Sequence, residues 1–155
     1  RKSRAQIDKS GVLVDGEVGL ITFLAKCCKP APPDAIAGFV TKGRGISVHR
    51  QSCAAYINLA QMHPDKIVNT QWSELKAGQV FPIDLEITAR DRNGLLRDVS
   101  EAFSRNKLNV IGVNTLTKDA LATMRFTVEI KQVEDLPKVM GNINDIKGVF
   151  TVNRI

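Results

Sequence analysis

Apolar and polar residues alternate along two stretches in the second half of the chain. Every second residue is apolar over residues 81–90 and again over residues 122–130. This period of two predicts strands that each bury one face. Apolar residues recur at helical spacing over residues 95–106 and 136–146, and they predict two helices that each carry one buried stripe.

The stretches between and after these elements complete the order. Residues 108–117 are rich in β-forming residues but change phase near Gly112, which indicates a bulge. Lys147 and Gly148 predict the end of the second helix, and residues 149–153 predict a last short strand. The order β-α-β-β-α-β is ferredoxin-like, with two helices on one face of a four-stranded antiparallel sheet. The fold class is therefore α+β.

The first half is less regular, with strand-sized apolar runs bounded by Gly and Pro. A short helix is predicted over Ser52–Met62, with Ser52 as its N-cap and Ala55, Leu59 and Met62 facing inward. A unit of about 60–70 residues has little core of its own and benefits from a stabilising cross-link such as a bound metal or a disulfide. The predicted strands are residues 12–14, 20–25, 36–40, 46–48 and 67–72.

These patterns predict four segments along the chain. Residues 1–11 are a flexible N-terminal segment, residues 12–73 a small β/α domain, residues 74–80 a linker and residues 81–155 the ferredoxin-like domain. The 155 residues are 43% hydrophobic and 25% charged, as in ordinary globular proteins, and no apolar run is long enough to cross a membrane. The chain begins at Arg1 without an initiator Met and has no signal-peptide pattern, so we expect part of a longer, cytoplasmic protein.

The net charge of +6 is unevenly distributed. Residues 1–80 hold 11 Lys and Arg against 6 Asp and Glu, whereas residues 81–155 hold 11 against 10. The first half is thus +5 and the second half +1. Such a charge asymmetry is typical of proteins that bind a polyanionic partner, although an ordinary solvated surface explains it as well.

Four soft metal ligands occur within a short stretch of the first half. Cys27 and Cys28 are adjacent, and His49 and Cys53 lie four residues apart. Three thiolates and one imidazole suit a closed, tetrahedral structural zinc site. Neighbouring side chains on a strand diverge, so both Cys27 and Cys28 can point inward only if a turn forms at Lys29-Pro30. Packed free thiols are the alternative.

Several cations in the same half could face a phosphate backbone. The stretch Thr41 to Gly45 lacks the third glycine and the following helix of a dinucleotide loop. It instead predicts a two-glycine hairpin turn. The candidate RNA-binding residues are Lys26, Lys29, Lys42, Arg44 and Arg50. Asp91, Asp98 and Glu101 have no His or nucleophile beside them in the sequence, so we predict no catalytic site in this chain and no catalytic cofactor.

Two motifs resemble a known family. Residues 24–30, residues 38–50 and Cys53 resemble the zinc-finger, or conserved-cysteine, domain of long RelA/SpoT proteins, the bacterial stringent-response enzymes that make or degrade (p)ppGpp. The first motif looks more like the RelA or Rel type than the SpoT type. Residues 81–155, with the turn at residues 91–98, resemble the ACT domain of the same proteins.

The resemblance implies a regulatory role. In the family these domains contact ribosomal RNA and tRNA on stalled ribosomes and relay amino-acid starvation to an N-terminal (p)ppGpp synthetase, a GTP pyrophosphokinase. It also implies that Cys27, Cys28, His49 and Cys53 bind zinc. Two positions depart from the family: Ser52 replaces an acidic residue, and Pro32-Pro33-Asp34 replaces a Pro-Gly-Asp turn. Neither departure removes a thiol or imidazole.

ACT domains also bind small effectors, often amino acids, at the first strand–helix turn and commonly across a dimer interface. The matching positions here are Asp91, Asn93, Gly94 and Leu95, whose backbone at a helix N-terminus could take a carboxylate. A tight turn that only feeds a packed helix is the alternative. The leading hypothesis is therefore a non-catalytic RNA-contacting module, and the second is an amino-acid-sensing, dimerising ACT module.

Overall fold

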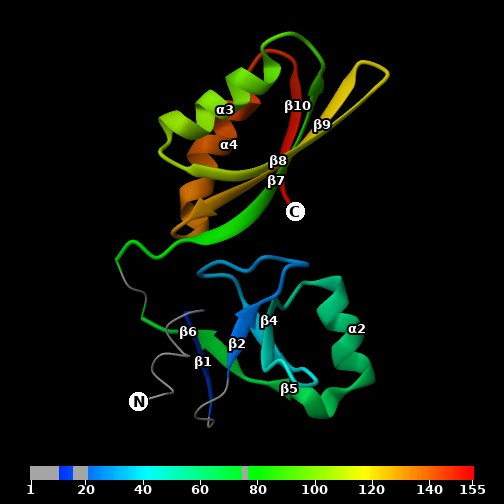
Figure 1. Ribbon diagram of the computed structural model, residues 1–155, viewed down its shortest axis with the longest axis vertical. Coiled ribbons are helices and arrows are strands. Elements are labelled where there is room, and N and C mark those ends of the chain that lie inside the picture. Colours follow the sequence, from blue (N-terminus) through cyan, green and yellow to red (C-terminus); the bar gives the residue numbers. More distant parts are fainter. Residues whose placement is uncertain (1–10, 16–20, 75–76) are drawn as a thin grey trace. The chain divides into compact units, whose positions relative to one another are not determined.

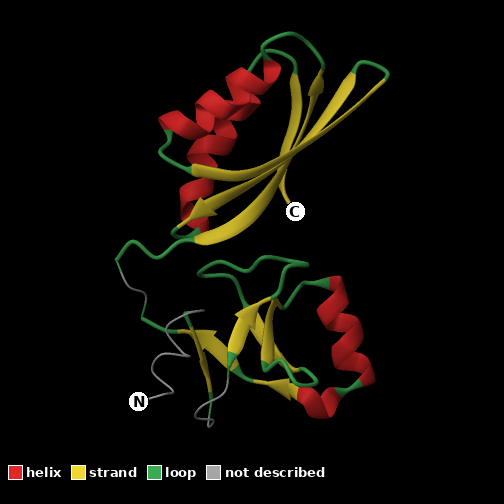
Figure 2. Ribbon diagram, viewed as in Figure 1, coloured by secondary structure: helices red, strands yellow, loops and turns green. Residues whose placement is uncertain are grey.

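The computed structural model describes residues 11–15, 21–74 and 77–155. It divides between Gln79 and Val80 into two compact units, each described by itself below. Both units mix strands with a small number of helices (Figure 2), which confirms the α+β class. The N-terminal segment up to residue 10 and positions 75–76 of the predicted linker lie outside the described residues. No helix among the described residues combines the length and apolar content needed to cross a membrane.

The first unit contains two small sheets (Figure 1). One pairs β1 (Val12–Val14) with β6 (Thr70–Trp72) in antiparallel fashion. The other has the order β2-β4-β3-β5 and comprises β2 (Thr22–Leu24), β3 (Ile36–Val40), β4 (Ile46–Arg50) and β5 (Ile67–Val68). β3 and β4 form an antiparallel hairpin, whereas β2 lies parallel to β4. The predicted strand over residues 67–72 was therefore wrong as one element, because its halves belong to different sheets.

Among the described residues, the core of the first unit includes two small clusters. Val12, Ile36 and Val48 form one, against which Leu24 and Trp72 pack. The other consists of Ala25, Cys28 and Cys53, with Tyr56 against it. Two cysteines thus take the place of aliphatic side chains in a core that is otherwise very small.

The helix of this unit differs from the prediction. α2 spans Ala54–Met62, its N-cap is Cys53 rather than Ser52, and none of its residues is buried. The predicted inward face was wrong, since Met62 is 71% exposed and Ala55 is also exposed. α2 is joined through the 3-10 turn η1 (Pro64–Lys66) to β5. Tyr56 in its first turn packs against Ala25, Cys28 and Cys53, and His63 at its C-cap lies against Phe39 of β3.

The second unit has the predicted ferredoxin-like order. Its strands are β7 (Phe81–Arg90), β8 (Asn109–Lys118), β9 (Leu121–Ile130) and β10 (Val149–Arg154), and its helices are α3 (Leu95–Arg105) and α4 (Leu136–Asn144), the latter preceded by the 3-10 turn η2 (Val133–Asp135). The sheet order is β10-β7-β9-β8 and every pair is antiparallel. Both helices cover the same face of this sheet (Figure 1).

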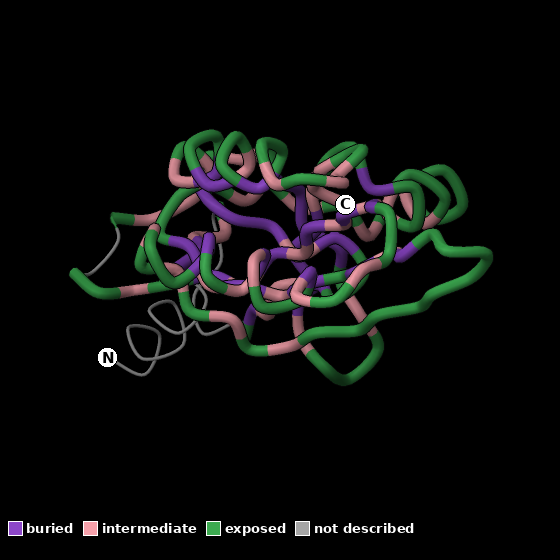
Figure 3. Tube along the Cα trace, turned by 90° about the horizontal axis from the view of Figure 1, so that it is seen from above, coloured by how far each residue is buried: buried purple, intermediate pink, exposed green. Residues whose placement is uncertain are grey.

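The core of the second unit follows the alternating pattern of β7 and β9. Figure 3 colours each described residue by its burial. Each odd-numbered residue of β7 is buried, and β9 presents its own buried residues opposite them. Phe126 of β9 meets Phe103 of α3 with ring centroids 5.0 Å apart. The register of β8 shifts between Val110 and Gly112, as the sequence predicted. α4 ends earlier than predicted, at Asn144, so Gly148 lies in the turn before β10 instead of closing the helix.

Candidate metal centre

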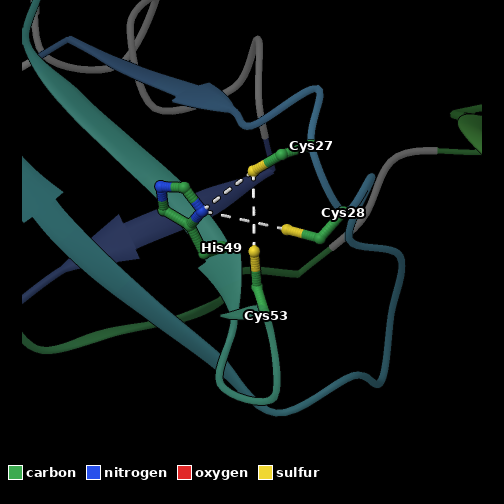
Figure 4. A group of neighbouring side chains, drawn as sticks. All are labelled: Cys27, Cys28, His49 and Cys53. Carbon is green, nitrogen blue, oxygen red and sulfur yellow. Dashed lines mark hydrogen bonds between the residues drawn. The ribbon is translucent and has the colours of Figure 1, made fainter. Parts of the chain in front are cut away.

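The four predicted soft ligands meet at one point of the first unit (Figure 4). Cys27 and Cys28 lie in the turn after β2, His49 lies in β4, and Cys53 caps α2. Their ligand atoms all lie within 4.8 Å of one another. The Sγ atom of Cys27 is 3.4 Å from Nδ1 of His49 and 3.6 Å from Sγ of Cys53. Such a set of four donors can hold a metal ion.

Adjacent cysteines converge because they do not lie on a strand. The turn covers residues 26–28, closed by a hydrogen bond from the Lys29 backbone N–H to the Ala25 carbonyl at 3.0 Å. It therefore forms a little earlier than the predicted turn at Lys29-Pro30. Lys29 follows with a left-handed φ of 45°, which redirects the chain after the cysteine pair. Sγ of Cys28 also accepts a hydrogen bond from the Arg50 backbone N–H at 3.3 Å.

His49 is oriented by a serine that the sequence analysis missed. Ser47 stands two residues earlier on β4, on the same face of the strand, and its hydroxyl lies 3.1 Å from Nε2 of His49. The same hydroxyl donates a hydrogen bond to the Phe39 carbonyl at 3.3 Å. Since its proton is used there, Ser47 accepts from the Nε2–H of His49. That assignment leaves the Nδ1 lone pair directed at the three sulfurs.

Burial governs the charge states of the cluster. It lowers the pKa of His49, so the imidazole is neutral at pH 7. Burial is also the main cause that raises the pKa of Cys27, and it raises the pKa of Cys28 to about 12. Burial opposes ionisation of Cys53 too, but the backbone amides of Tyr56 and Ala55, with the neighbouring thiols, outweigh it and lower the pKa of Cys53.

Tyr56 is the second residue near this site that the sequence analysis missed. It lies in the first turn of α2 and packs against the cluster formed by Ala25, Cys28 and Cys53. Its ring centroid is 5.7 Å from that of His49. The signal available in the sequence was its position one turn after Cys53, which places it next to the same ligands.

The candidate RNA-binding residues fall into two groups. Lys42 and Arg44 lie in the β3–β4 hairpin turn, which a hydrogen bond from the Thr41 N–H to the Gly45 carbonyl closes at 2.9 Å. Of the other three candidates, Lys26 and Lys29 follow β2, and Arg50 is the last residue of β4. Because β2 and β4 are parallel, the turn before β4 and the turn after β2 lie at opposite ends of this sheet. The five candidates therefore form two groups at opposite ends of this sheet.

The hairpin group lies in the turn that the sequence predicts. Lys42 is exposed, and the Arg44 guanidinium lies over the ring of Phe23, 4.6 Å from its centroid. In the other group Lys29 directs its Nζ atom to the Lys26 carbonyl at 3.4 Å. Arg44 is thus held in place by a cation–π contact. The Lys42 side chain is exposed and has no such contact among the described residues.

The four candidate effector-binding residues line one open pocket of the second unit. Asp91, Asn93, Gly94 and Leu95 surround a volume of about 410 Å³ between the β7–α3 turn and Thr115 of β8. Arg92 in the same turn donates a hydrogen bond to Asp98 at 2.8 Å. This interaction is the main cause that lowers the pKa of Asp98.

Comparisons with known proteins place this chain in a class and then in a family. Residues 77–154 match the family model described as the ACT domain, which makes the chain an ACT-domain protein. Residues 12–73 match the RelA/SpoT RIS domain. The chain therefore belongs to the RelA/SpoT family, and the resemblance stated from its motifs is confirmed.

Its relatives are much longer than the chain itself. It is 36% identical over 156 residues to the GTP pyrophosphokinase of Haemophilus influenzae, covering 99% of this chain and 21% of that protein. It is 39% identical over 151 residues to the GTP pyrophosphokinase of Escherichia coli (96% and 20%). It is 37% identical over 149 residues to the bifunctional (p)ppGpp synthase/hydrolase RelA of Mycobacterium tuberculosis (96% and 20%).

The chain thus spans about a fifth of these curated relatives and matches their C-terminal region. Since the catalytic part of those enzymes is N-terminal, the expectation that this region is not itself the enzyme is confirmed. Among solved structures, the ACT domain from the GTP pyrophosphokinase of Chlorobium tepidum is 25% identical with a TM-score of 0.45, over 50% of this chain and 100% of that one.

Proposed function

We propose that this chain is a regulatory module of a longer (p)ppGpp synthetase. A zinc ion holds the RIS domain together, and the module contacts ribosomal RNA and tRNA on stalled ribosomes in the cytoplasm. It passes the amino-acid-starvation signal to an N-terminal synthetase domain of the same protein. The observation that carries the proposal is the tandem of RIS and ACT domains in one chain, at 36% to 39% identity to GTP pyrophosphokinases.

The geometry of the cysteine–histidine cluster supports zinc as its metal. Zn–S bonds of about 2.3 Å and Zn–N bonds of about 2.0–2.1 Å give tetrahedron edges of roughly 3.8 Å between sulfurs and roughly 3.6 Å between sulfur and nitrogen. The separations of Cys27 from His49, Cys27 from Cys53 and Cys28 from His49 are 3.4, 3.6 and 3.9 Å. Four protein ligands leave no open coordination position, so this zinc is structural.

Metal analysis tests the zinc assignment directly. Protein purified without chelator or metal-binding tag is expected to carry one zinc per chain by elemental mass spectrometry. Replacing Cys28 with Ser removes a buried ligand, and the zinc content should fall to near zero. Replacing Ser73, which lies away from the four ligands in sequence, with Ala is the control. Absence of zinc from the unmodified chain after refolding with excess zinc would remove the metal from the proposal.

RNA contact is supported by charge and position. The hairpin turn exposes Lys42 and orients Arg44 on Phe23, and net charge is concentrated in the first half of the chain. Cations that contact phosphates release counterions, so binding should weaken steeply as salt is raised. Phosphate contacts of this kind position the protein on RNA rather than read its sequence.

The two cation groups allow a matched RNA-binding experiment. Binding to purified ribosomes and to tRNA is measured across a salt series for Lys42→Glu, Lys26→Glu and the control Lys118→Glu. Each variant changes the net charge by the same amount, but Lys118 lies in the ACT domain. Loss of affinity in either RIS variant, with a shallower salt dependence and an unaffected control, supports the proposal. Equal effects in all three variants would reduce it to a general charge effect.

The second candidate function is amino-acid sensing by the ACT domain. It is favoured by the pocket that Asp91, Asn93, Gly94 and Leu95 line at the N-terminus of α3. An amino-acid carboxylate there would meet backbone N–H groups, with Arg97 beside them. A homodimer through the ACT domain would accompany this function.

Calorimetry with the twenty amino acids separates the two candidates. Saturable heat with one amino acid, lost in Arg97→Ala, supports the sensing module. Absence of saturable heat with all twenty, together with salt-dependent RNA binding, supports the RNA-contacting module. Sedimentation in the same conditions tests the accompanying dimer.

A further inference from the structure

The three sulfurs of the metal centre differ in access. Cys28 and Cys53 are buried, at 4% and 9% exposure, whereas Cys27 is exposed. An oxidant in solution therefore reaches Cys27 first. The sulfur across from it is that of Cys53, 3.6 Å away and 26 residues later in the sequence (Figure 4).

We propose that Cys27 and Cys53 form a peroxide-sensitive dithiol, whose oxidation to a disulfide releases the metal. The inference rests on the zinc site of the proposed function, and it adds a modification of that site. His49 and Cys28 alone remain as ligands after the reaction. Two ligands do not retain zinc in competition with ordinary chelators.

The reaction balances with hydrogen peroxide as the oxidant. The Cys27 sulfur attacks one peroxide oxygen, the O–O bond breaks, and hydroxide leaves, so that Cys27 becomes a sulfenic acid. The Cys53 sulfur then attacks the Cys27 sulfur, the S–O bond breaks, and a second hydroxide leaves. The two sulfurs together lose two electrons, peroxide gains them, and two protons from solution convert the hydroxides to water.

Cys28 is a poor alternative partner for Cys27. Adjacent Cα atoms are about 3.8 Å apart across a trans peptide, below the roughly 4.4–6.8 Å that disulfides span. The Cys28 sulfur is also held by the Arg50 N–H. Joining Cys27 to Cys53 instead shortens an existing contact from 3.6 Å to a bond of about 2.05 Å.

The disulfide preserves one of the connections that the metal makes, but it does not replace the connections to His49 and Cys28. Like the metal, it connects the turn after β2 to the start of α2, across 26 residues. It does not hold His49 on β4, nor the Cys28 sulfur beneath Tyr56. The oxidised domain is therefore cross-linked but metal-free, and a thiol reductant with added zinc restores the original state.

Zinc release and thiol mapping test the inference in one experiment. The zinc-loaded chain, at a dilution that disfavours links between chains, is treated with hydrogen peroxide in the presence of a chromogenic zinc chelator. Peptide mapping without reductant then identifies the disulfide. We expect one zinc released for each Cys27–Cys53 disulfide formed, with Cys28 still open to alkylation.

Two single substitutions provide the matched comparison. Cys27→Ser and Cys28→Ser each remove one ligand and weaken zinc binding. Only Cys28→Ser keeps both Cys27 and Cys53. Peroxide should therefore form the Cys27–Cys53 disulfide in Cys28→Ser, and it should form no disulfide in Cys27→Ser. This mapping does not require either variant to hold zinc.

Three results overturn the inference: retained zinc after peroxide treatment, a disulfide that includes Cys28, or oxidation of single thiols without a cross-link. Failure of the proposed function looks different. In that case the untreated chain binds no zinc at all, so no release can be scored, whereas failure of the inference alone leaves a zinc-loaded chain that peroxide does not cross-link.

Discussion

The two domains of this chain hold themselves together in different ways. In the ACT domain, long alternating strands bury Ile83, Leu85 and Phe126 completely under the two helices. In the RIS domain the described core includes two clusters of three buried residues each, and one of these contains Cys28 and Cys53. The comparison teaches that a regular hydrophobic period can stabilise one fold, whereas its neighbour places four potential metal ligands where they can stabilise the other.

Removing the metal is expected to have the largest effect, and this effect should differ between the two domains. Binding of structural zinc contributes about 10–16 kcal/mol in zinc-finger peptides, more than the whole stability of many small domains. A strong chelator should therefore unfold the RIS domain and leave the ACT domain folded. Trp72 is the one Trp in the sequence and lies in the RIS domain, so its fluorescence reports that domain. Far-UV circular dichroism reports the remaining ACT structure, and an unchanged Trp72 transition would contradict the comparison.

A core substitution in the ACT domain should have the opposite effect, because it destabilises the ACT domain and leaves the stability of the RIS domain unchanged. Phe126 is fully buried and packs on Phe103. Truncation of a buried Phe to Ala costs about 3–5 kcal/mol. Phe126→Ala should lower the urea midpoint seen by circular dichroism while the Trp72 transition stays in place. A shift of both transitions by the same amount would mean that the domains unfold as one unit.

Acid should act on the RIS domain through its thiols. In the metal-free fold the pKa of Cys27 is raised and that of Cys28 is about 12, so both are protonated at pH 7, while the lowered pKa of His49 leaves it neutral. Zinc binding then displaces at least two protons, and three where Cys53 is also protonated. The affinity should fall about 100-fold or more for each unit that the pH decreases. Competition with a chelator between pH 6.5 and 7.5 measures the slope, and a pH-independent affinity would contradict the assigned thiol states.

The smallest expected effect comes from the serine behind His49. Ser47→Ala removes the acceptor for the Nε2–H of His49 and keeps all four ligands. Loss of such a partner typically lowers metal affinity about 10–100-fold. Zinc affinity is compared with that of Ser104→Ala, an exposed serine of α3. Equal affinities would show that the strand, and not Ser47, orients the imidazole.

The ACT fold could be predicted almost completely from the sequence. The period of two over β7 and β9, and the helical spacing over α3, reflect one buried face in each element, and the structure buries those faces. Even the phase change near Gly112 identified the bulge in β8. The end of α4 was misplaced because Gly148 is a turn glycine, and a positive φ serves a turn as well as a helix end.

The RIS domain could be predicted only in part. The short strands were found, but α2 was given an inward face that it lacks, because contacts near Cys53 and Tyr56 hold the helix. The division of residues 67–72 between two sheets depends on pairing with β3 and β1, which no local pattern records. For the same reason, only the parallel pairing of β2 and β4 shows that the candidate cations form two groups.

The parallel pairing of β2 and β4 also has a consequence for the order in which the domain assembles. The β3–β4 hairpin is local and can close early, and it brings His49 with Cys53 one helical turn further on. Cys27 and Cys28 arrive only when β2 docks, which closes a much longer loop. If zinc is present during folding, we expect His49 and Cys53 to bind it first and Cys27 and Cys28 to bind it when β2 docks. Added zinc should then speed refolding, because the partly bound ion would act as a template for β2.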